Sequence, residues 1–258
     1  MQILAEEDLT EAPDLVELLG SVPYSSSLPQ CTIRAAAEPM MWASLESDAY
    51  SKQEENHLNP LTTVKWPLII GFAVAVIIAS LIGGFAFNEM SFARWLHIVS
   101  GIFWIGLLYY FNAVQTPALA AAGADKGGPG GAGINKYVAP RALLWFRWSA
   151  LATWLMGAWL LSLTHGRFVD TFTFGLLQNP VQDSNIIMGI GAWLGTIMLF
   201  NVWVLTWPNQ KKILGIVPAT DEQKAAARKV ALYASRTNFL LSIPMLMCMI
   251  GPSHGLPF

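Results

Sequence analysis

Three histidines border long apolar segments of this sequence and offer imidazole nitrogens for chemistry. His97 lies near the start of one segment, whereas His165 and His254 each follow another. Histidines on two different helices can hold a haem iron through two axial nitrogens, and zinc or copper also accepts imidazole. We expect His97 to be the principal ligand, because an ionisable group at membrane depth is costly and commonly faces the interior of a helix bundle. Its partner would be His254 or His165.

The residues around these histidines fit a haem b. Gly101 and Trp104 follow His97 on the same helical face, where a small residue admits a flat macrocycle and an indole forms a wall. Arg94 and Arg167 lie at the same predicted end and could pair with the propionates, because guanidinium binds carboxylate bidentately. Under the other interpretation, these His and Arg side chains only extend into lipid headgroups. Spacing alone leaves both interpretations open.

The composition of the chain is that of a membrane protein. Of its 258 residues, 54% are hydrophobic and 12% are charged, about half the charged share of a soluble domain. The formal net charge of −2 argues against a nucleic-acid partner, because phosphate binding needs a clustered basic patch. Cys31 lies in a polar region and Cys248 in an apolar one, so neither a disulfide framework nor a cysteine metal site is expected.

Five apolar segments must position the candidate residues, and they predict an all-α, polytopic membrane helix bundle with about five transmembrane helices. The first four are long enough to cross a hydrocarbon core of about 30 Å at about 1.5 Å per residue. The fourth is rich in glycine, which lets neighbouring helices approach closely, and the fifth is shorter and contains Pro244. The predicted spans are residues 66–87, 94–115, 143–164, 186–207 and 238–251.

The distribution of Lys and Arg predicts the orientation of these spans. Most of the cations flank one side and only Arg94 and Arg167 the other, and cytoplasmic flanks retain positive charge. We therefore expect a multi-pass protein of a bacterial-type inner (plasma) membrane, with a cytoplasmic N-terminus and the three histidines at the opposite face. Residues 1–65 are polar and rich in Pro and Ser, which predicts a disordered cytoplasmic tail before a transmembrane domain of residues 66–258.

Other chemistry finds less support in the sequence. The spans contain no Asp or Glu, which argues against hydrolysis by a Ser/His/Asp triad or a carboxylate pair. An aromatic cluster around Arg147 could line a purine-sized pocket, but an aromatic belt at the membrane interface is the favoured interpretation. The cluster consists of Trp145, Phe146, Trp148 and Trp154.

Four segments of the chain carry a resemblance to a known family. They read RWLHIVSGIFWIGLLYYFNAVQ from Arg94, WFRWSALATWLMG from Trp145, NVWVLTWPNQKKI from Asn201 and SRTNFLLSIPMLMCMIGPSH from Ser235. Together they resemble the membrane-bound urate hydroxylase family, whose membrane part is the urate oxidase N-terminal domain. The resemblance implies an integral membrane protein that oxidises urate to 5-hydroxyisourate in purine breakdown and sends electrons to a fused cytochrome c domain.

The resemblance also singles out residues. It implies His97 and His254 as candidates for a redox site that holds haem iron. It further implies a set of motif residues that contact substrate or stabilise the bundle, namely Trp148, Asn201, Trp207, Asn209 and Asn238.

Two departures from the family pattern weaken the transfer of activity. The sequence has no C-x-x-C-H for covalent haem, so the electron acceptor is expected to be a separate cytochrome. Ser149 stands where the motif leads us to expect an acidic residue, which removes a possible proton acceptor.

Three functions compete on this basis, and whether the chain is an enzyme stays open. The leading hypothesis is a membrane redox protein that binds haem b, acts on urate or a related purine and passes electrons to a separate cytochrome c. The alternative is a non-enzymatic membrane subunit or anchor of a larger respiratory-type complex. Transport of a metal or small anion ranks last, because the paired broken helices of many transporters are not recognisable.

Overall fold

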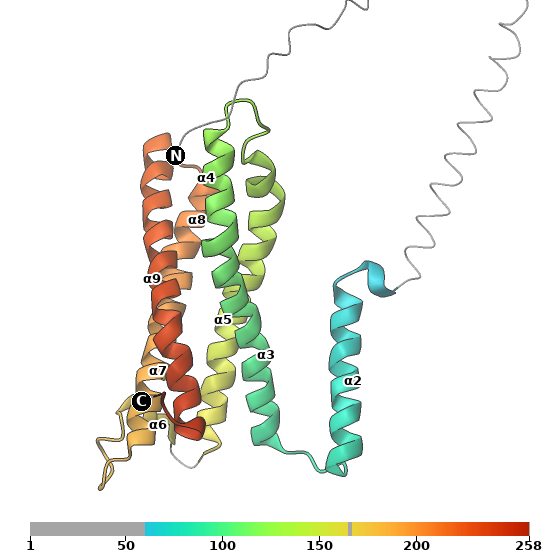
Figure 1. The fold of residues 1–258 in the computed structure, drawn as a ribbon, viewed down its shortest axis with the longest axis vertical. Coiled ribbons are helices and arrows are strands. Elements are labelled where there is room, and N and C mark those ends of the chain that lie inside the picture. The colour runs from blue at the N-terminus through green and yellow to red at the C-terminus, as the bar shows by residue number, and fades with distance from the viewer. Residues whose placement is uncertain (1–59, 165–166, 258) are drawn as a thin grey trace, which may run out of the picture. The chain divides into compact units, whose positions relative to one another are not determined.

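The computed structural model describes residues 60–164 and 167–257, and every regular element in these ranges is a helix (Figure 1). The predicted all-α fold class is therefore confirmed. The chain divides into two units, Met1–Ala86 and Phe87–Phe258, and each is described by itself. The predicted tail of residues 1–65 lies almost wholly outside the described residues, so its boundary with the transmembrane domain stays a prediction.

The first unit contains one long helix, α2 (Lys65–Gly83), after a short 3-10 turn, η2 (Pro60–Thr62). Lys65 is the one charged residue of α2, and none of the residues of the helix is buried. The helix ends at Gly84, whose φ of 69° is left-handed and whose N–H bonds the carbonyl of Ser80. Glycine adopts this conformation without steric cost, which explains why α2 ends at Gly83, before the predicted end of the first span at residue 87.

Within the described residues, three helical stretches are long and apolar enough to cross a membrane: α2, Glu89–Ala124 and Asp183–Ile213. The second stretch joins α3 (Glu89–Tyr110), η3 (Phe111–Gln115) and α4 (Thr116–Ala124). The third joins α7 (Asp183–Phe200), η5 (Asn201–Thr206) and α8 (Trp207–Ile213). The second and third stretches contain the second and fourth predicted spans, and α2 contains the first predicted span up to Gly83.

Two further helices correspond to the other two predicted spans. Helix α5 (Ala139–Ser162) contains the third span except for its last two residues, and α9 (Asp221–His254) contains the fifth. The helix α9 is much longer than predicted, because its polar first half buries a row of alanines, Ala227, Ala231 and Ala234, against the bundle. All five predicted segments are thus helical, whereas the number that cross the membrane stays a prediction.

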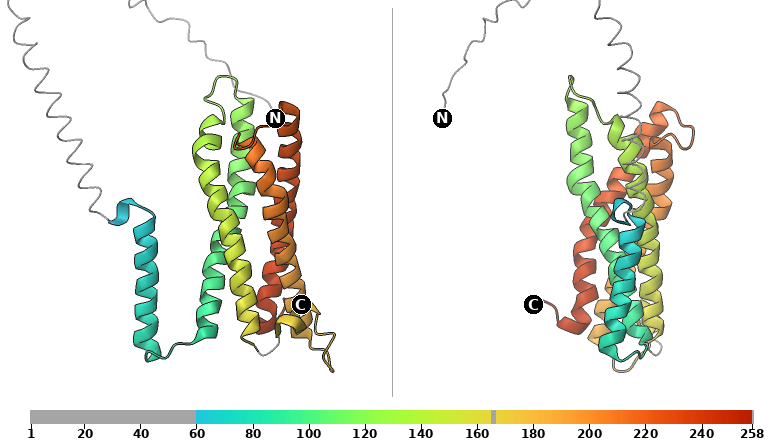
Figure 2. Two further views of the ribbon diagram at one scale, coloured as in Figure 1. Left: turned by 180° about the vertical axis from the view of Figure 1, so that it is seen from behind. Right: turned by 90° about the vertical axis from the view of Figure 1, so that its right-hand side faces the viewer.

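The helices of the second unit run alternately up and down (Figures 1 and 2). Helix α3 packs chiefly on α5, and α7 packs chiefly on α9. One end of the bundle holds the start of α3, the end of α5, α6 (Arg167–Phe172), the start of α7 and the end of α9; we name it the α6 end. The opposite end, named the α8 end, holds α4, the start of α5, α8 and the start of α9.

Three π-helical segments interrupt the bundle, and proline explains each of them. The segments are η3, η4 (Ile134–Val138) and η5, and Pro117, Pro140 and Pro208 stand at the start of the α-helices that follow them. Proline lacks the N–H of the helical ladder, and its ring clashes with the carbonyl four residues before it. A widened π turn relieves that clash without breaking the helix.

Buried amides join the helices near two of these segments. In η3, Asn112 Nδ2 donates to Ser235 Oγ on α9 at 2.9 Å. In η5, Asn201 Nδ2 donates to Asn238 Oδ1 on α9 at 2.8 Å, and Asn238 Nδ2 donates to the carbonyl of Met198 at 2.9 Å. Because buried amides inside an apolar bundle need partners, these bonds fix the register of α9 against its neighbours. Asn201 and Asn238, which the family resemblance singled out, thus bind each other.

Around these bonds lies an apolar core drawn from four helical stretches, formed by Trp104, Leu108, Phe146, Ala150, Met198, Val202 and Met245.

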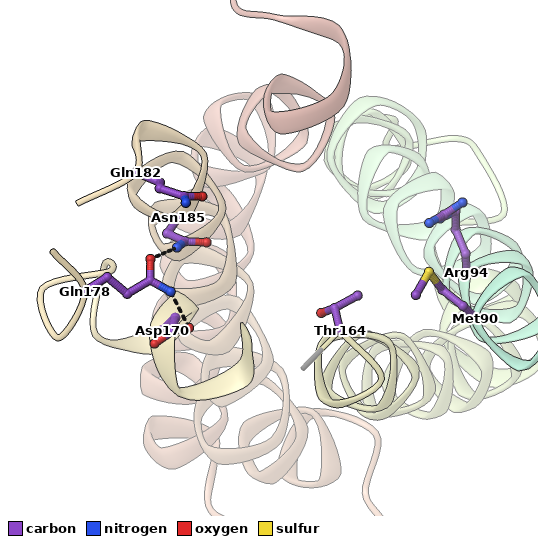
Figure 3. A pocket seen from close by; sticks show the side chains of 7 residues that line it. All are labelled: Met90, Arg94, Thr164, Asp170, Gln178, Gln182 and Asn185. Carbon is purple, nitrogen blue, oxygen red and sulfur yellow. Dashed lines mark hydrogen bonds between the residues drawn. The ribbon is translucent and has the colours of Figure 1, made fainter. Parts of the chain in front are cut away.

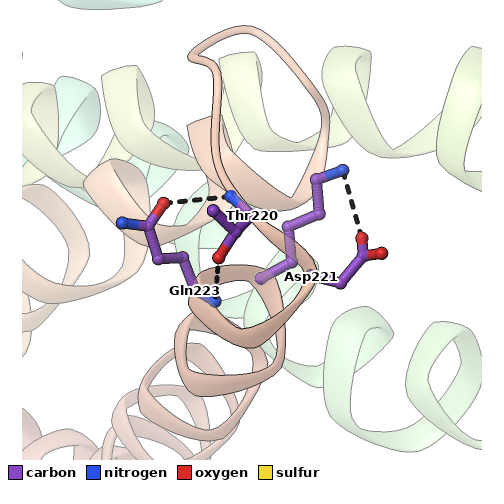
Figure 4. A network of polar contacts seen from close by, with 4 residues as sticks. Thr220, Asp221 and Gln223 are labelled. Carbon is purple, nitrogen blue, oxygen red and sulfur yellow. Dashed lines mark hydrogen bonds and ion pairs between the residues drawn. The ribbon is translucent and has the colours of Figure 1, made fainter.

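A capping box fixes the start of α9 at the α8 end (Figure 4). Thr220 Oγ1 accepts from the backbone N–H of Gln223 at 3.3 Å, and Gln223 Oε1 accepts from the N–H of Thr220 at 3.0 Å. Two free N–H groups of the first turn are thereby paired. The pKa of Glu222 is lowered by a hydrogen bond from its own backbone N–H and by one from the Thr220 side chain.

Candidate functional site

His97 lies between α3 and α5 with its ring fixed by a backbone hydrogen bond. Its Nδ1 is 2.8 Å from the carbonyl oxygen of Thr153. Because a carbonyl only accepts, Nδ1 carries the proton, and in the neutral ring Nε2 is left unprotonated. Metal-binding histidines commonly donate their other ring N–H to a carbonyl in this way. The unprotonated Nε2 is the ring atom that could bind a metal, and the role of His97 as an axial ligand to a haem iron stays a prediction.

Two glycines bring α3 and α5 close together at His97. A Cβ on Gly157 would lie 2.9 Å from His97 Cε1 and 3.0 Å from Nδ1, which is closer than side chains pack. A Cβ on Gly101 would lie 3.6 Å from Thr153 Cγ2, an ordinary contact. The space above Gly101 is thus occupied by Thr153, and its predicted role in admitting a macrocycle stays a prediction.

Trp104 belongs to the apolar core and not to the surface of the bundle. Its side chain is 3% exposed, and its Nε1–H is buried without a hydrogen-bond partner among the described residues. The predicted role of Trp104 as an aromatic wall for a haem stays a prediction.

A cavity of about 540 Å³ lies at the α6 end of the bundle (Figure 3). One wall comes from α3 and from Thr164, two residues after the end of α5, and the other comes from α6, α7 and the loop between them. The lining residues are Met90, Arg94, Thr164, Asp170, Gln178, Gln182 and Asn185. Arg94, predicted to pair with a propionate, is exposed and faces this cavity.

The wall opposite Arg94 is a chain of hydrogen-bonded polar side chains. Asn185 Nδ2 donates to Gln178 Oε1 at 2.7 Å, and Gln178 Nε2 donates to Asp170 Oδ2 at 2.6 Å. Asn185 is only 4% exposed, so packing holds the Asn185 end of this hydrogen-bonded row of side chains in place. The bonds leave Asp170 with acceptor capacity and fix which way the two amides point. With a cation on one wall and a carboxylate on the other, the cavity suits a small molecule that carries an anionic group and N–H donors.

The structure shows less about the other predicted site residues, His254, His165 and Arg167. His254 is exposed at the end of α9, with Nδ1 3.1 Å from Ser253 Oγ, and α9 ends at the same end of the bundle at which α3 begins. His165 lies outside the described residues, and Arg167 begins α6. Within the described residues no group of three or more His, Cys, Asp or Glu could hold a metal ion. The second axial ligand stays a prediction.

The aromatic motif residues lie at the α8 end, at the other end of α5 from Thr164. The Arg147 guanidinium stacks on Trp207, 3.7 Å from the ring centre, and Trp203 Nε1 donates to the Arg147 carbonyl at 3.2 Å. Trp148 packs edge-on against Trp203 and is 53% exposed, as an aromatic belt requires. Asn209 Nδ2 donates to the carbonyl of Leu205 within its own helical stretch.

Ser149, which replaces an expected acid, is buried and donates to the carbonyl of Phe146 at 3.1 Å. Its hydroxyl is therefore used within α5.

Sequence reasoning missed the polar wall of the cavity. Asp170, Gln178 and Asn185 stand between the third and fourth predicted spans, where the search for ligands considered only His165 and Arg167. The available signal was the density of carboxylate and amide side chains over residues 170–185, a segment that starts and ends at one face of the bundle.

The fold and the cavity define a helical protein with three helices able to cross a membrane and a polar cavity at one end of its bundle. Residues 166–258 match the model of the family described as urate oxidase N-terminal, which confirms the predicted resemblance to that family over this part of the chain. The match includes the wall formed by Asp170, Gln178 and Asn185, and it does not include Arg94 or His97. No curated protein and no solved structure matches the chain.

Proposed function

We propose that this protein is an integral membrane oxidoreductase that oxidises urate or a related purine and passes the electrons to a separate cytochrome. The observation that carries the proposal is the cavity at the α6 end, because its acid and amide wall lies within the residues that match the urate oxidase N-terminal family. Family membership alone would not transfer an activity, since function depends on the site.

The cavity offers groups that complement a urate anion. Arg94 can pair with the negative charge through a charge-assisted hydrogen bond. Asp170 can accept from a ring N–H group, and the amides of Gln178 and Asn185 can accept from ring N–H groups and donate to ring carbonyls. Urate presents both kinds of group along its edges, so both walls would be used at once.

The proposed reaction is an oxidation in which water supplies the added oxygen. Urate and water give 5-hydroxyisourate, two protons and two electrons. Among the described residues, Asp170 is the one carboxylate that lines the cavity, and it is the candidate acceptor for a proton released there. Haem b, held by His97 Nε2 and a second histidine, would accept the released electrons one at a time.

The proposed topology places this cavity outside the cytoplasm. Five helices cross a bacterial-type inner membrane, the N-terminus is cytoplasmic, and the α6 end faces the opposite side. The proposal is supported by the concentration of Lys and Arg at the α8 end, because cytoplasmic flanks retain positive charge.

The test is an optical spectrum of the detergent-purified protein, oxidised and dithionite-reduced, with pyridine hemochrome quantitation and an assay of urate loss with oxidised cytochrome c. We expect a reduced b-type α-band near one haem per chain and urate-dependent reduction of the cytochrome. The variant His97→Ala should lose the haem and stay in the membrane, because one axial bond supplies much of the affinity. A protein from haem-replete cells without a Soret band would reject the haem, and loaded protein without urate turnover would reject the substrate.

A second candidate function, a non-enzymatic subunit or anchor, is favoured by α2. This helix is apolar around its whole circumference, so it can pack against lipid or a helix of another membrane protein. Purification of stoichiometric membrane partners without urate turnover would favour this function over the oxidoreductase.

A further inference from the structure

A second charged feature lies at the α8 end and takes no part in the proposed reaction. Arg147 on α5 stacks its guanidinium on the Trp207 ring of α8, and Lys211 Nζ lies 5.9 Å from the centre of the same ring. We propose that these residues bind the phosphate of an anionic phospholipid headgroup between α5 and α8.

The stacking prepares Arg147 to bind an oxyanion. A guanidinium that lies flat on an indole keeps its N–H groups at the edge of the stack, where they can form two parallel bonds to one phosphate. The backbone of Arg147 is held by the hydrogen bond from Trp203 Nε1 to its carbonyl. Within the part of the chain that the structure describes, no hydrogen-bond acceptor meets the guanidinium, so its donors are available.

The charge balance around the stack favours an anionic partner from outside the chain. The segments that form the α8 end, residues 116–147 and 207–236, contain ten Lys or Arg and three Asp or Glu. The one ion pair among the described residues, Lys224 with Asp221 at 3.7 Å, lies in the first turn of α9 and does not involve Arg147 or Lys211. An uncompensated cation cluster of this kind attracts phosphate.

The surroundings of the stack select a lipid as the source of the phosphate. Trp148 packs edge-on against Trp203 with more than half of its side chain exposed, and Trp145 beside it is 43% exposed. Exposed indoles at the end of a membrane helix lie at headgroup depth, and basic pockets between such helices bind anionic headgroups. An acyl chain can then follow the apolar surface of the bundle below the rings.

The experiment uses the full-length protein in a neutral detergent, titrated with phosphatidylglycerol or with phosphatidylcholine. Bound lipid is counted by native mass spectrometry, and the thermal unfolding midpoint is followed in parallel. We expect phosphatidylglycerol to bind and raise the midpoint, whereas phosphatidylcholine does neither. Arg147→Gln should weaken apparent binding about fivefold. Arg141→Gln is the matched control, because Arg141 is an exposed cation on the same helix without a ring contact, and it should bind lipid like the unaltered protein.

Three results would overturn the proposal: equal binding of both lipids, equal losses in the Arg147 and Arg141 variants, or the same rise in midpoint with inorganic phosphate as with phosphatidylglycerol. The last result would mean that the stack binds a soluble anion. Should Arg147→Gln fail to fold, Lys211→Gln provides the test, because Lys211 lies on a half-exposed face of α8 and should also weaken lipid binding severalfold.

Discussion

The two ends of the bundle handle charge in different ways. At the α6 end, Asp170, Gln178 and Asn185 bond to one another and face a lone arginine across an open cavity. At the α8 end, Arg147 and Lys211 share an aromatic ring and have no acid partner among the described residues. The first end carries its own counter-groups and can orient a small molecule, whereas the second depends on anions that the chain does not supply.

The comparison shows why polar residues in a membrane bundle should be interpreted by what surrounds them. Hydrogen-bonded side chains that line a cavity are already oriented and lose little freedom when a ligand binds. Cations stacked on indoles are oriented as well. They select a ligand by its charge and not by its shape, because a phosphate can contact them only at the edge of the stack.

The largest expected effect separates the roles of Arg94 and Arg147. Arg94→Gln should raise the KM for urate about ten- to hundredfold, because it removes a charge-assisted hydrogen bond to the substrate. Arg147→Gln should leave that KM unchanged, and Arg94→Gln should leave phosphatidylglycerol binding unchanged. Steady-state kinetics and native mass spectrometry on both variants would check this, and a rise in KM in both would contradict the separation of the two ends.

A smaller effect is expected where α3 and α5 meet at the α6 end. Gly157→Ala should destabilise the protein by about 1–3 kcal/mol, because the new methyl group would collide with the His97 ring. The matched control is Gly106→Ala on α3, where a Cβ would have open space. Thermal unfolding of both variants is the measurement, and equal midpoints would show that the His97 ring is not confined by Gly157.

The smallest effect is expected at the start of α9, at the α8 end. Thr220→Ala should cost about 1 kcal/mol of stability, because a capping hydrogen bond is lost. Glu222 adds a pH dependence: its pKa is lower in the folded protein, so its contribution is present above the ordinary pKa of Glu and is lost as the pH falls through the folded value. Unfolding midpoints measured from pH 6 down to pH 3 should fall less steeply in Thr220→Ala, and an unchanged slope would contradict the role of Thr220.

The sequence predicted the helices well and the site only in part. Long apolar runs marked all five helical segments, because exclusion of charge from a membrane interior is a strong constraint. The first half of α9, residues 221–237, was missed because it is mostly polar, and its buried alanines do not form an apolar run that a sequence pattern would detect. His97 was predicted as a ligand from its type and position alone, and that role stays a prediction. Its hydrogen bond to Thr153 and its close approach to Gly157 depend on how α5 packs, which no local pattern contains.

The cavity wall was missed for a related reason. Asp170 and Asn185 are brought together by the turn between α6 and α7, and Gln178 bridges them from the loop. Such a bridge depends on loop geometry, for which a single sequence offers few signals.

The π-helical segments have a consequence for the phase of the helical pattern. A π turn holds one residue more than an α turn, so the faces of α3 and α4, or of α7 and α8, are offset by about 100° relative to an unbroken α-helix. A helical wheel drawn straight through Phe111–Gln115 or Asn201–Thr206 would therefore assign lipid-facing and core-facing positions incorrectly on one side of the segment. A deletion of one residue within either segment would remove this offset: the π segment could close into a regular α turn, and every downstream side chain would keep the neighbour that it has now.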